Sequence, residues 1–175
     1  MDKSFLIAQL VERLRQTATV ARRAGEAAAT EAREGATPAE KRETGQVAME
    51  FAGLARGQKE RAGRTAMELS MLETFRPPAR LPRGAPIAVG AIVEVEGEFE
   101  VERDGEEMIG CQGRTFFLAP VGAGVELSGP GGDGFLSVVT PVSPIGKAVL
   151  GRRVGDTIEV MVDGEPREWT ITFVE

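Results

Sequence analysis

The sequence predicts an α+β protein in which a long helical hairpin precedes a sheet domain. Apolar residues recur every three or four positions over the first 75 residues or so, and from about residue 91 they alternate with polar ones. The proline-rich segment RPPARLPRGAP separates the two patterns. We therefore expect an antiparallel α-helical coiled-coil hairpin at residues 1–76, a linker at residues 77–86, and an antiparallel β-sheet domain with one short helix at residues 87–175.

The composition limits the classes of function that the chain can perform. Its 175 residues include one cysteine, Cys111, which excludes an internal disulfide, and no histidine, which excludes Ser-His-Asp catalysis and His-ligated zinc. No apolar run approaches the roughly 20 residues of a membrane span, and the N-terminal segment is charged too early for a secretory signal. We expect a cytoplasmic protein without a membrane partner.

Charge is distributed unevenly between the two halves of the chain. Residues 1–84 hold 15 Lys and Arg against 11 Asp and Glu, a net +4, whereas residues 85–175 hold 6 against 16, a net −10. Binding of plain duplex DNA needs a concentrated basic face, which this balance does not favour. A protein partner with patches of both signs fits better.

The helical pattern runs from Ser4 to about Glu34 and resumes after a turn at residues 36–45, where Pro38 cannot lie inside a helix. Two helices of about 30 residues would form a rod of roughly 45 Å. Gly53, Gly57 and Gly63 weaken the second helix by about 1 kcal/mol each and permit close helix approach or a bend. The expected seam consists of Leu6, Leu10, Leu14, Thr17, Ala21, Ala24 and Ala28 on the first helix, and of Val47, Phe51, Leu54, Gln58, Ala62, Thr65, Leu69 and Leu72 on the second.

The second half reads as strands joined by short turns. AIVEVEGEFEVE alternates apolar and acidic residues, which predicts a half-buried strand with a turn or bulge near Gly97 and a solvated row from Glu94 to Glu102. Hairpin turns are expected at RDGEE and at Asp163-Gly164, and the glycine-rich segment SGPGGDG is expected to be a loop without a phosphate-binding motif. We expect Trp169 in the core and Cys111 as a small buried hydrophobe.

The stretch VSPIGKAVLGRRVGD predicts the short helix. Ser143 is a favourable N-cap, Pro144 suits the first helical position, and Gly151 suits the residue just past the end. The apolar residues of this helix, Ile145, Ala148, Val149 and Leu150, are expected to pack mostly on the sheet.

SPIGKAVLGRRVGDTIEV, followed by a hairpin and WTITFVE, resembles the C-terminal domain of the GreA/GreB family of bacterial transcript cleavage factors. The resemblance implies an FKBP-like domain that binds RNA polymerase at the rim of its secondary channel, while the coiled coil enters the channel and reaches the nascent RNA 3′ end indirectly. It also implies a cofactor of the polymerase rather than an independent enzyme. The implied docking residues are Ser143, Pro144, Ile145, Lys147, Arg152 and Arg153.

In that family two acidic residues at the hairpin tip help to hold a catalytic Mg²⁺. The matching pair here is Glu40 and Glu43, with Mg²⁺ supplied in the polymerase active site and no metal bound by the isolated protein. The tip departs from the family stretch Gly-Asp-Leu-x-Glu-Asn-Ala-Glu-Tyr, because Lys41 follows the first acid and the Asn and Tyr are missing. The same two acids would also suit a helix N-terminus capped by Thr37, and both interpretations stay open.

Other functions remain as alternatives. In one alternative the protein is a secondary-channel inhibitor, whose hairpin occludes the channel without promoting cleavage. In another it is a coiled-coil adaptor for some other protein, with no nucleic-acid chemistry. A prolyl isomerase, suggested by the FKBP-like fold, needs an aromatic-lined pocket, which a domain with few aromatic residues and no tyrosine does not favour.

Overall fold

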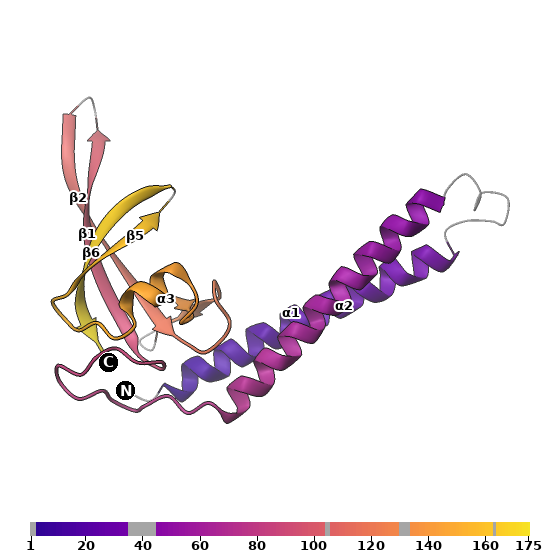
Figure 1. The fold of residues 1–175 in the computed structure, drawn as a ribbon, viewed down its shortest axis with the longest axis horizontal. Helices are drawn as coiled ribbons and strands as arrows, with labels where there is room; N and C mark the ends of the chain where they lie inside the picture. The colour runs from indigo at the N-terminus through magenta and orange to yellow at the C-terminus, as the bar shows by residue number, and fades with distance from the viewer. Residues whose placement is uncertain (1–2, 35–44, 104–105, 130–133, 163) are drawn as a thin grey trace. The chain divides into compact units, whose positions relative to one another are not determined.

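The computed structural model describes residues 3–34, 45–103, 106–129, 134–162 and 164–175 (Figure 1). In these described residues two long helices come first, followed by six strands with one short helix between the fourth and the fifth, so the predicted α+β class is confirmed. The elements are α1 (Ser4–Glu34), α2 (Gly45–Thr74), β1 (Ile92–Arg103), β2 (Glu106–Leu118), β3 (Glu126–Ser128), β4 (Phe135–Val139), α3 (Pro144–Val149), β5 (Thr157–Val162) and β6 (Glu165–Val174).

The contacts divide the chain into two compact units. The sheet unit combines Met1–Leu10 with Thr74–Glu175, and the hairpin unit is Val11–Glu73. Helix α1 therefore begins in the sheet unit, although the helix itself is continuous. The domain boundary expected at the proline-rich linker stays a prediction.

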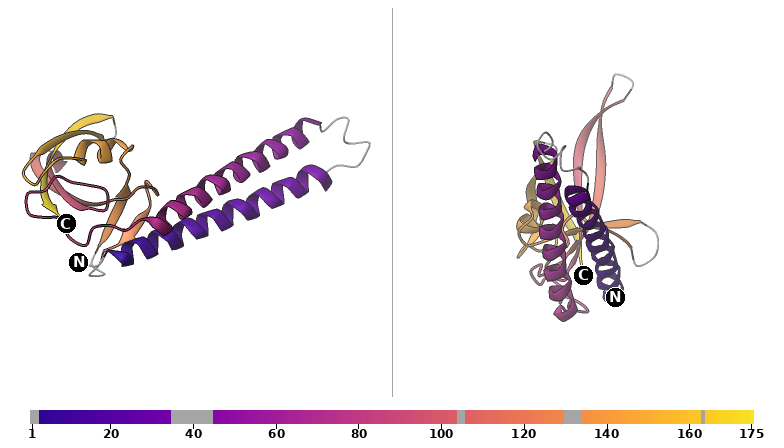
Figure 2. Two further views of the ribbon diagram at one scale, coloured as in Figure 1. Left: turned by 60° about the horizontal axis from the view of Figure 1, so that its bottom comes forward. Right: turned by 90° about the vertical axis from the view of Figure 1, so that its right-hand side faces the viewer.

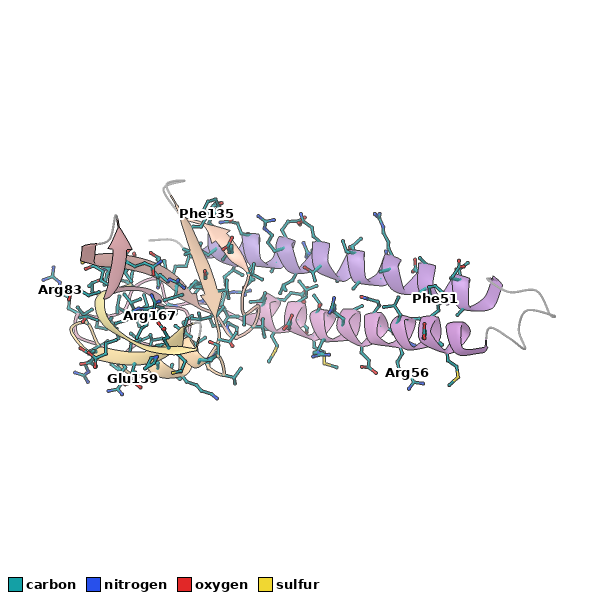
Figure 3. All side chains as sticks on the ribbon, turned by 90° about the horizontal axis from the view of Figure 1, so that it is seen from above. Phe51, Arg56, Arg83, Phe135, Glu159 and Arg167 are labelled. Carbon is teal, nitrogen blue, oxygen red and sulfur yellow. The ribbon has the colours of Figure 1, made fainter. Side chains whose placement is uncertain are left out.

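In the hairpin unit, α1 and α2 run antiparallel and side by side (Figures 1 and 2). They approach closely at Gly25, where a Cβ atom would lie 3.3 Å from the Cβ of Gln58 and 3.7 Å from the carbonyl oxygen of Ala55. Phe51 is half-buried between the two helices (Figure 3). Gly25 is thus the small residue of α1 that permits this close approach to α2.

Three residues of the expected seam are exposed instead: Thr17, Ala24 and Leu54, of which Leu54 is 50% exposed. The buried positions of α1 in this unit, Leu14, Ala21 and Ala28, recur every seven residues. Half-buried Gly25 lies between the last two, so the contact with α2 is centred one residue beyond Ala24. A seven-residue repeat keeps one narrow stripe of the helix facing its partner. The spacing of three and four residues in the sequence did not show which residues belong to this stripe.

The glycines of α2 do not serve close helix approach. A Cβ atom added at Gly53, Gly57 or Gly63 would meet no other atom within 4 Å. The close approach occurs at Gly25 of α1, so the expected role of the three glycines was wrong in this respect.

In the sheet unit, the strands follow the order β3-β4-β2-β1-β6-β5. All neighbouring strands are antiparallel except β2 and β4, which are parallel where Phe116–Leu118 pair with Ser137–Val139. An entirely antiparallel sheet was expected from the sequence. The exception arises because the chain passes through β3 before β4, and β4 then returns beside β2 in the same direction.

One buried cluster of the sheet unit lies on one face of these strands, and residues that alternate with its members, such as Phe117 and Val138, are buried on the other face. In the described residues this cluster contains Ile87, Ala91, Val93, Val95, Phe116, Leu118, Val139, Val149, Ile158, Val160, Trp169 and Ile171. Trp169 is 3% exposed and stacks on Phe116 with ring centroids 6.0 Å apart, so its predicted core position is confirmed. The Arg114 guanidinium lies 5.5 Å from the centroid of the Trp169 ring.

Strand β1 runs through Gly97 without a turn, and its pairing with β2 continues from Ile92 to Arg103. A register shift does occur, but at Glu94/Val95 on the side of β6. Gly97 has a different role: a Cβ atom there would collide with the Trp169 ring and would lie 2.9 Å from the carbonyl oxygen of Glu168. Glycine is required at this position because the indole crosses the strand.

The start of α1 is held by three contacts within the sheet unit. The Gln9 side-chain amide donates to the Ser128 carbonyl at 3.1 Å and accepts from the Ser128 N–H at 3.1 Å. A residue of a neighbouring strand would form the same pair of hydrogen bonds with Ser128. The Lys3 ammonium donates to the Pro78 carbonyl at 3.1 Å. The side chain of Leu10 packs against Gly122, whose φ of 85° favours glycine.

Candidate functional site

Local hydrogen bonds fix where α3 begins. The Ser143 hydroxyl accepts from the Gly146 N–H at 3.1 Å and donates to the Thr140 carbonyl at 2.8 Å. A side chain at Gly146 would collide with the Thr140 carbonyl oxygen, so the cap tolerates only glycine there. Pro144 is the first helical residue and Gly151, with φ of 79°, follows the C-cap, as predicted.

The inner face of α3 packs on the sheet. Val149 is fully buried, and Ile145 and Ala148 are partly buried against the core. Leu150 was expected mostly in the core, but its side chain is 40% exposed. It is the C-cap residue with ψ of 127°, so its backbone has left the helical conformation and its side chain no longer follows the inner face.

The outer face of α3 and the adjoining loops form a surface that is both apolar and basic, here called the α3 surface. Its exposed members are Val142, Pro144, Lys147, Leu150, Arg152, Arg153 and Val154. Val142 and Val154 were not among the docking residues expected from the sequence, although their places beside the cap serine and before Gly155 in the turn could have indicated exposure. The α3 surface carries three of the six Lys and Arg of residues 85–175, a region with 16 acidic residues.

The backbone behind these arginines is fixed, although their side chains are exposed. The Arg152 carbonyl accepts from the Ile87 N–H at 2.7 Å, and the Gly151 N–H donates to the Ile87 carbonyl at 2.9 Å. The Asp156 carboxylate accepts from the Arg153 N–H at 2.8 Å. A rigid loop that presents guanidinium groups beside apolar side chains is suited to docking on an acidic protein surface.

The expected docking residues thus fall into two groups. Pro144, Lys147, Arg152 and Arg153 are exposed on the α3 surface. Ser143 and Ile145 are half-buried and serve α3 itself, as the cap and as a core contact. Partner binding by all six stays a prediction.

The acidic pair Glu40 and Glu43 lies outside the described residues. Within the described part of the chain, no group of three or more acidic or cysteine side chains is placed to hold a metal ion. No helix there is long and apolar enough to span a membrane.

The sheet unit also carries an acidic hollow of about 450 Å³. Glu96, Glu98 and Glu168 line it together with Cys111 and three threonines. Exposure of Glu94, Glu96 and Glu98 confirms the solvated face predicted for this part of β1. Cys111 is exposed rather than buried, because it pairs with Glu98 and shares the outer face of the sheet.

Residues 131–175 match the sequence model of a family described as "Transcription elongation factor, GreA/GreB, C-term". This range holds β4, α3, β5 and β6 and therefore includes the whole α3 surface. Residues 131–175 are thus similar to the C-terminal segment of a family of transcription elongation factors. That family is GreA/GreB, so the resemblance expected from the sequence is confirmed.

Two solved structures are similar over nearly the whole chain. The GreA factor homolog 1 (Gfh1) protein of Thermus thermophilus is 16% identical, with 97% of this chain and 94% of that chain covered and a TM-score of 0.33. Thermus aquaticus Gfh1 is 21% identical, with 100% and 96% covered and a TM-score of 0.35. A comparison with curated protein sequences found no match.

Proposed function

We propose that this protein is a Gre-type regulator that binds bacterial RNA polymerase during transcription elongation. The observation that carries the proposal is the family match over residues 131–175, which contains the rigid, exposed and basic α3 surface. The order of elements, a long helical hairpin followed by this sheet unit, agrees with the architecture that the family resemblance implies.

Docking would use the α3 surface. Arg152 and Arg153 would pair with carboxylates of the polymerase, while Leu150 and Val154 would fill shallow apolar contacts beside them. Because the arginine side chains are exposed in the free protein, their attraction for an acidic partner is screened by salt, and association should slow as ionic strength rises.

The hairpin would enter the secondary channel of the polymerase. Helices of 31 and 30 residues give a rod of roughly 45 Å. In the cleavage-promoting form of the proposal, Glu40 and Glu43 would help to hold a Mg²⁺ ion that is shared with ligands from the polymerase, since Mg²⁺ keeps several waters and needs only one or two protein carboxylates. In the occluding form, the hairpin blocks the channel and RNA is not cut.

A binding experiment tests the docking step. Binding of the full chain to bacterial core polymerase is measured by biolayer interferometry for the wild type and for Arg152→Glu/Arg153→Glu. We expect the charge reversal to weaken binding about tenfold or more. Arg80→Glu/Arg83→Glu is the matched control, because both arginines are exposed and lie outside the α3 surface. Equal losses in the two variants, or no binding by the wild type, would refute the proposed docking.

A cleavage assay separates the two forms. Polymerase stalled on a backtracked template is incubated with the protein, and RNA length is followed with time. Shortened RNA that disappears in Glu40→Ala/Glu43→Ala but persists in the exposed-site control Glu50→Ala supports cleavage. Inhibition of elongation by both wild type and double variant, without shortened RNA, supports occlusion.

A further inference from the structure

The hairpin unit contains a groove that the proposed function does not use. Its volume is about 730 Å³ and its lining is predominantly apolar. Small residues form its floor: Ala21, Gly25 and Ala29 of α1 with Ala55, Ala62 and Gly63 of α2. Because these side chains are short, the two helices come close at Gly25 and leave a hollow along the contact.

The edges of this groove are mainly basic. Arg22, Arg56 and Lys59 lie along it with a single acid, Glu26, which pairs with Arg22 at 4.0 Å. Arg56 and Lys59 are exposed, and neither forms an ion pair with a residue in the described part of the chain. An occupant would therefore meet an apolar floor and two uncompensated positive charges on the α2 side.

We infer that this groove binds an amphipathic α-helix of a partner protein whose large apolar side chains are bordered by carboxylates. The groove spans residues 21–29 and 55–63, nine residues on each helix, which corresponds to about 13 Å along the axis. Leucine-sized side chains from a third helix would fill the holes left by alanine and glycine. Its carboxylates would reach Arg56 and Lys59.

A second copy of the chain fits less well. In a symmetric pair of hairpins packed groove to groove with α2 against α2, Arg56 and Lys59 of one copy would face the same residues of the other copy; with α2 against α1 they would face Arg22 and Glu26, which already pair with each other. Such repulsion between like charges disfavours self-association and selects for an acidic partner.

The test uses the full chain and two synthetic helical peptides of about three heptads, each with leucine at positions a and d. One peptide carries Glu at positions e and g and the other carries Lys there. Binding is measured by fluorescence anisotropy at low and at physiological ionic strength. We expect the Glu peptide to bind about tenfold more tightly than the Lys peptide, with amide chemical-shift changes at Gly25, Ala55 and Gly63.

Matched variants test whether the peptides bind in this groove. Arg56→Glu/Lys59→Glu should reverse the preference between the peptides, whereas Arg61→Glu/Arg64→Glu makes the same charge change on exposed residues outside the groove and should leave it unchanged. Ala62→Leu should abolish binding by filling the groove without a change of charge. Circular dichroism at 222 nm confirms that each variant keeps its helices.

Several outcomes would overturn the inference. These are equal binding of the two peptides, equal effects of the two charge reversals, or chemical-shift changes confined to other residues. Binding of dodecanoate but not of the Glu peptide would show a site for a small amphipathic anion instead. Dimerisation in sedimentation that is lost in Ala62→Leu would show that a second copy occupies the groove.

Discussion

Lys3 combines a positive charge with almost complete burial. Its side chain is 2% exposed, and its ammonium donates to the Pro78 carbonyl at 3.1 Å. Burial lowers the pKa of Lys3 below its ordinary value of 10.5, while the negative charge of Glu175 opposes the shift. The charged form is therefore less favourable in the folded protein than in water.

We expect the stability of the protein to depend on pH through this residue. Since the pKa of Lys3 is lower in the folded state, the unfolded chain binds more protons between the folded-state pKa and 10.5, and the contribution to stability rises with pH across that window. Urea unfolding of Lys3→Met should lack this rise and should show a midpoint at neutral pH at least as high as that of the wild type. The exposed lysine variant Lys59→Met should keep the rise; a rise retained in Lys3→Met would contradict the assignment.

Gly97 is a second residue at which a single added methyl group should change the stability of the protein. A methyl group there would collide with the Trp169 ring and crowd the Glu168 carbonyl, so Gly97→Ala should destabilise the sheet unit by about 1–3 kcal/mol. Trp169 is the only tryptophan in the chain, so its fluorescence reports the change directly.

Gly113→Ala is the control for this change. It lies on the neighbouring strand, and a methyl group there would come no closer than 3.9 Å to any other residue beyond its chain neighbours. We expect near-normal stability and an unchanged emission spectrum. Equal destabilisation by the two substitutions would show that loss of glycine, rather than the contact with the indole, is responsible.

At the scale of elements, α2 is weakened by glycines that make no close contact. Gly57→Ala adds a methyl group to open space in the helix interior, so it should stabilise the hairpin by about 0.5–1 kcal/mol. Thermal unfolding followed by circular dichroism at 222 nm measures the gain. Gly25→Ala should not stabilise, because its methyl group would lie 3.3 Å from the Gln58 Cβ atom; a similar gain at both positions would mean that the helices are not in close contact at Gly25.

At the scale of the whole molecule, the two units differ in what they bury. The seam of the hairpin unit is largely alanine, glycine and threonine, whereas the sheet unit has a core of large side chains and also includes Leu6 and Leu10 of α1. Burial of small side chains contributes less to stability. The hairpin unit is therefore expected to be the less stable of the two.

Unfolding followed by two probes tests this expectation. Helicity at 222 nm should begin to fall at a lower urea concentration than the fluorescence of Trp169 changes, because most helical residues belong to the hairpin unit and Trp169 belongs to the sheet unit. Gly57→Ala should narrow the interval between the two transitions. Coincident transitions in the wild type would show that the chain unfolds as one cooperative body.

Much of this protein follows from local sequence patterns. Periodicity identified α1 from Ser4 to Glu34, alternation identified β1, and Ser143, Pro144 and Gly151 identified α3 with both of its ends. The same stretch carried the resemblance to the GreA/GreB family, which the match over residues 131–175 confirmed. These features depend on neighbouring residues in the chain, so the sequence alone determined them.

Tertiary structure decided what depends on residues far apart in the chain. The parallel pairing of β2 with β4, the attachment of Gln9 to Ser128 and the role of Gly97 opposite Trp169 join positions separated by about 20 to about 120 residues, and no local pattern records such contacts. The exposure of Leu150 and Cys111 was likewise decided by which face of each element meets the core. The physical reason is that helix caps, helical hydrogen bonds and the periodicity of side chains link residues only a few positions apart. Packing and strand pairing instead join surfaces that only the folded chain brings together.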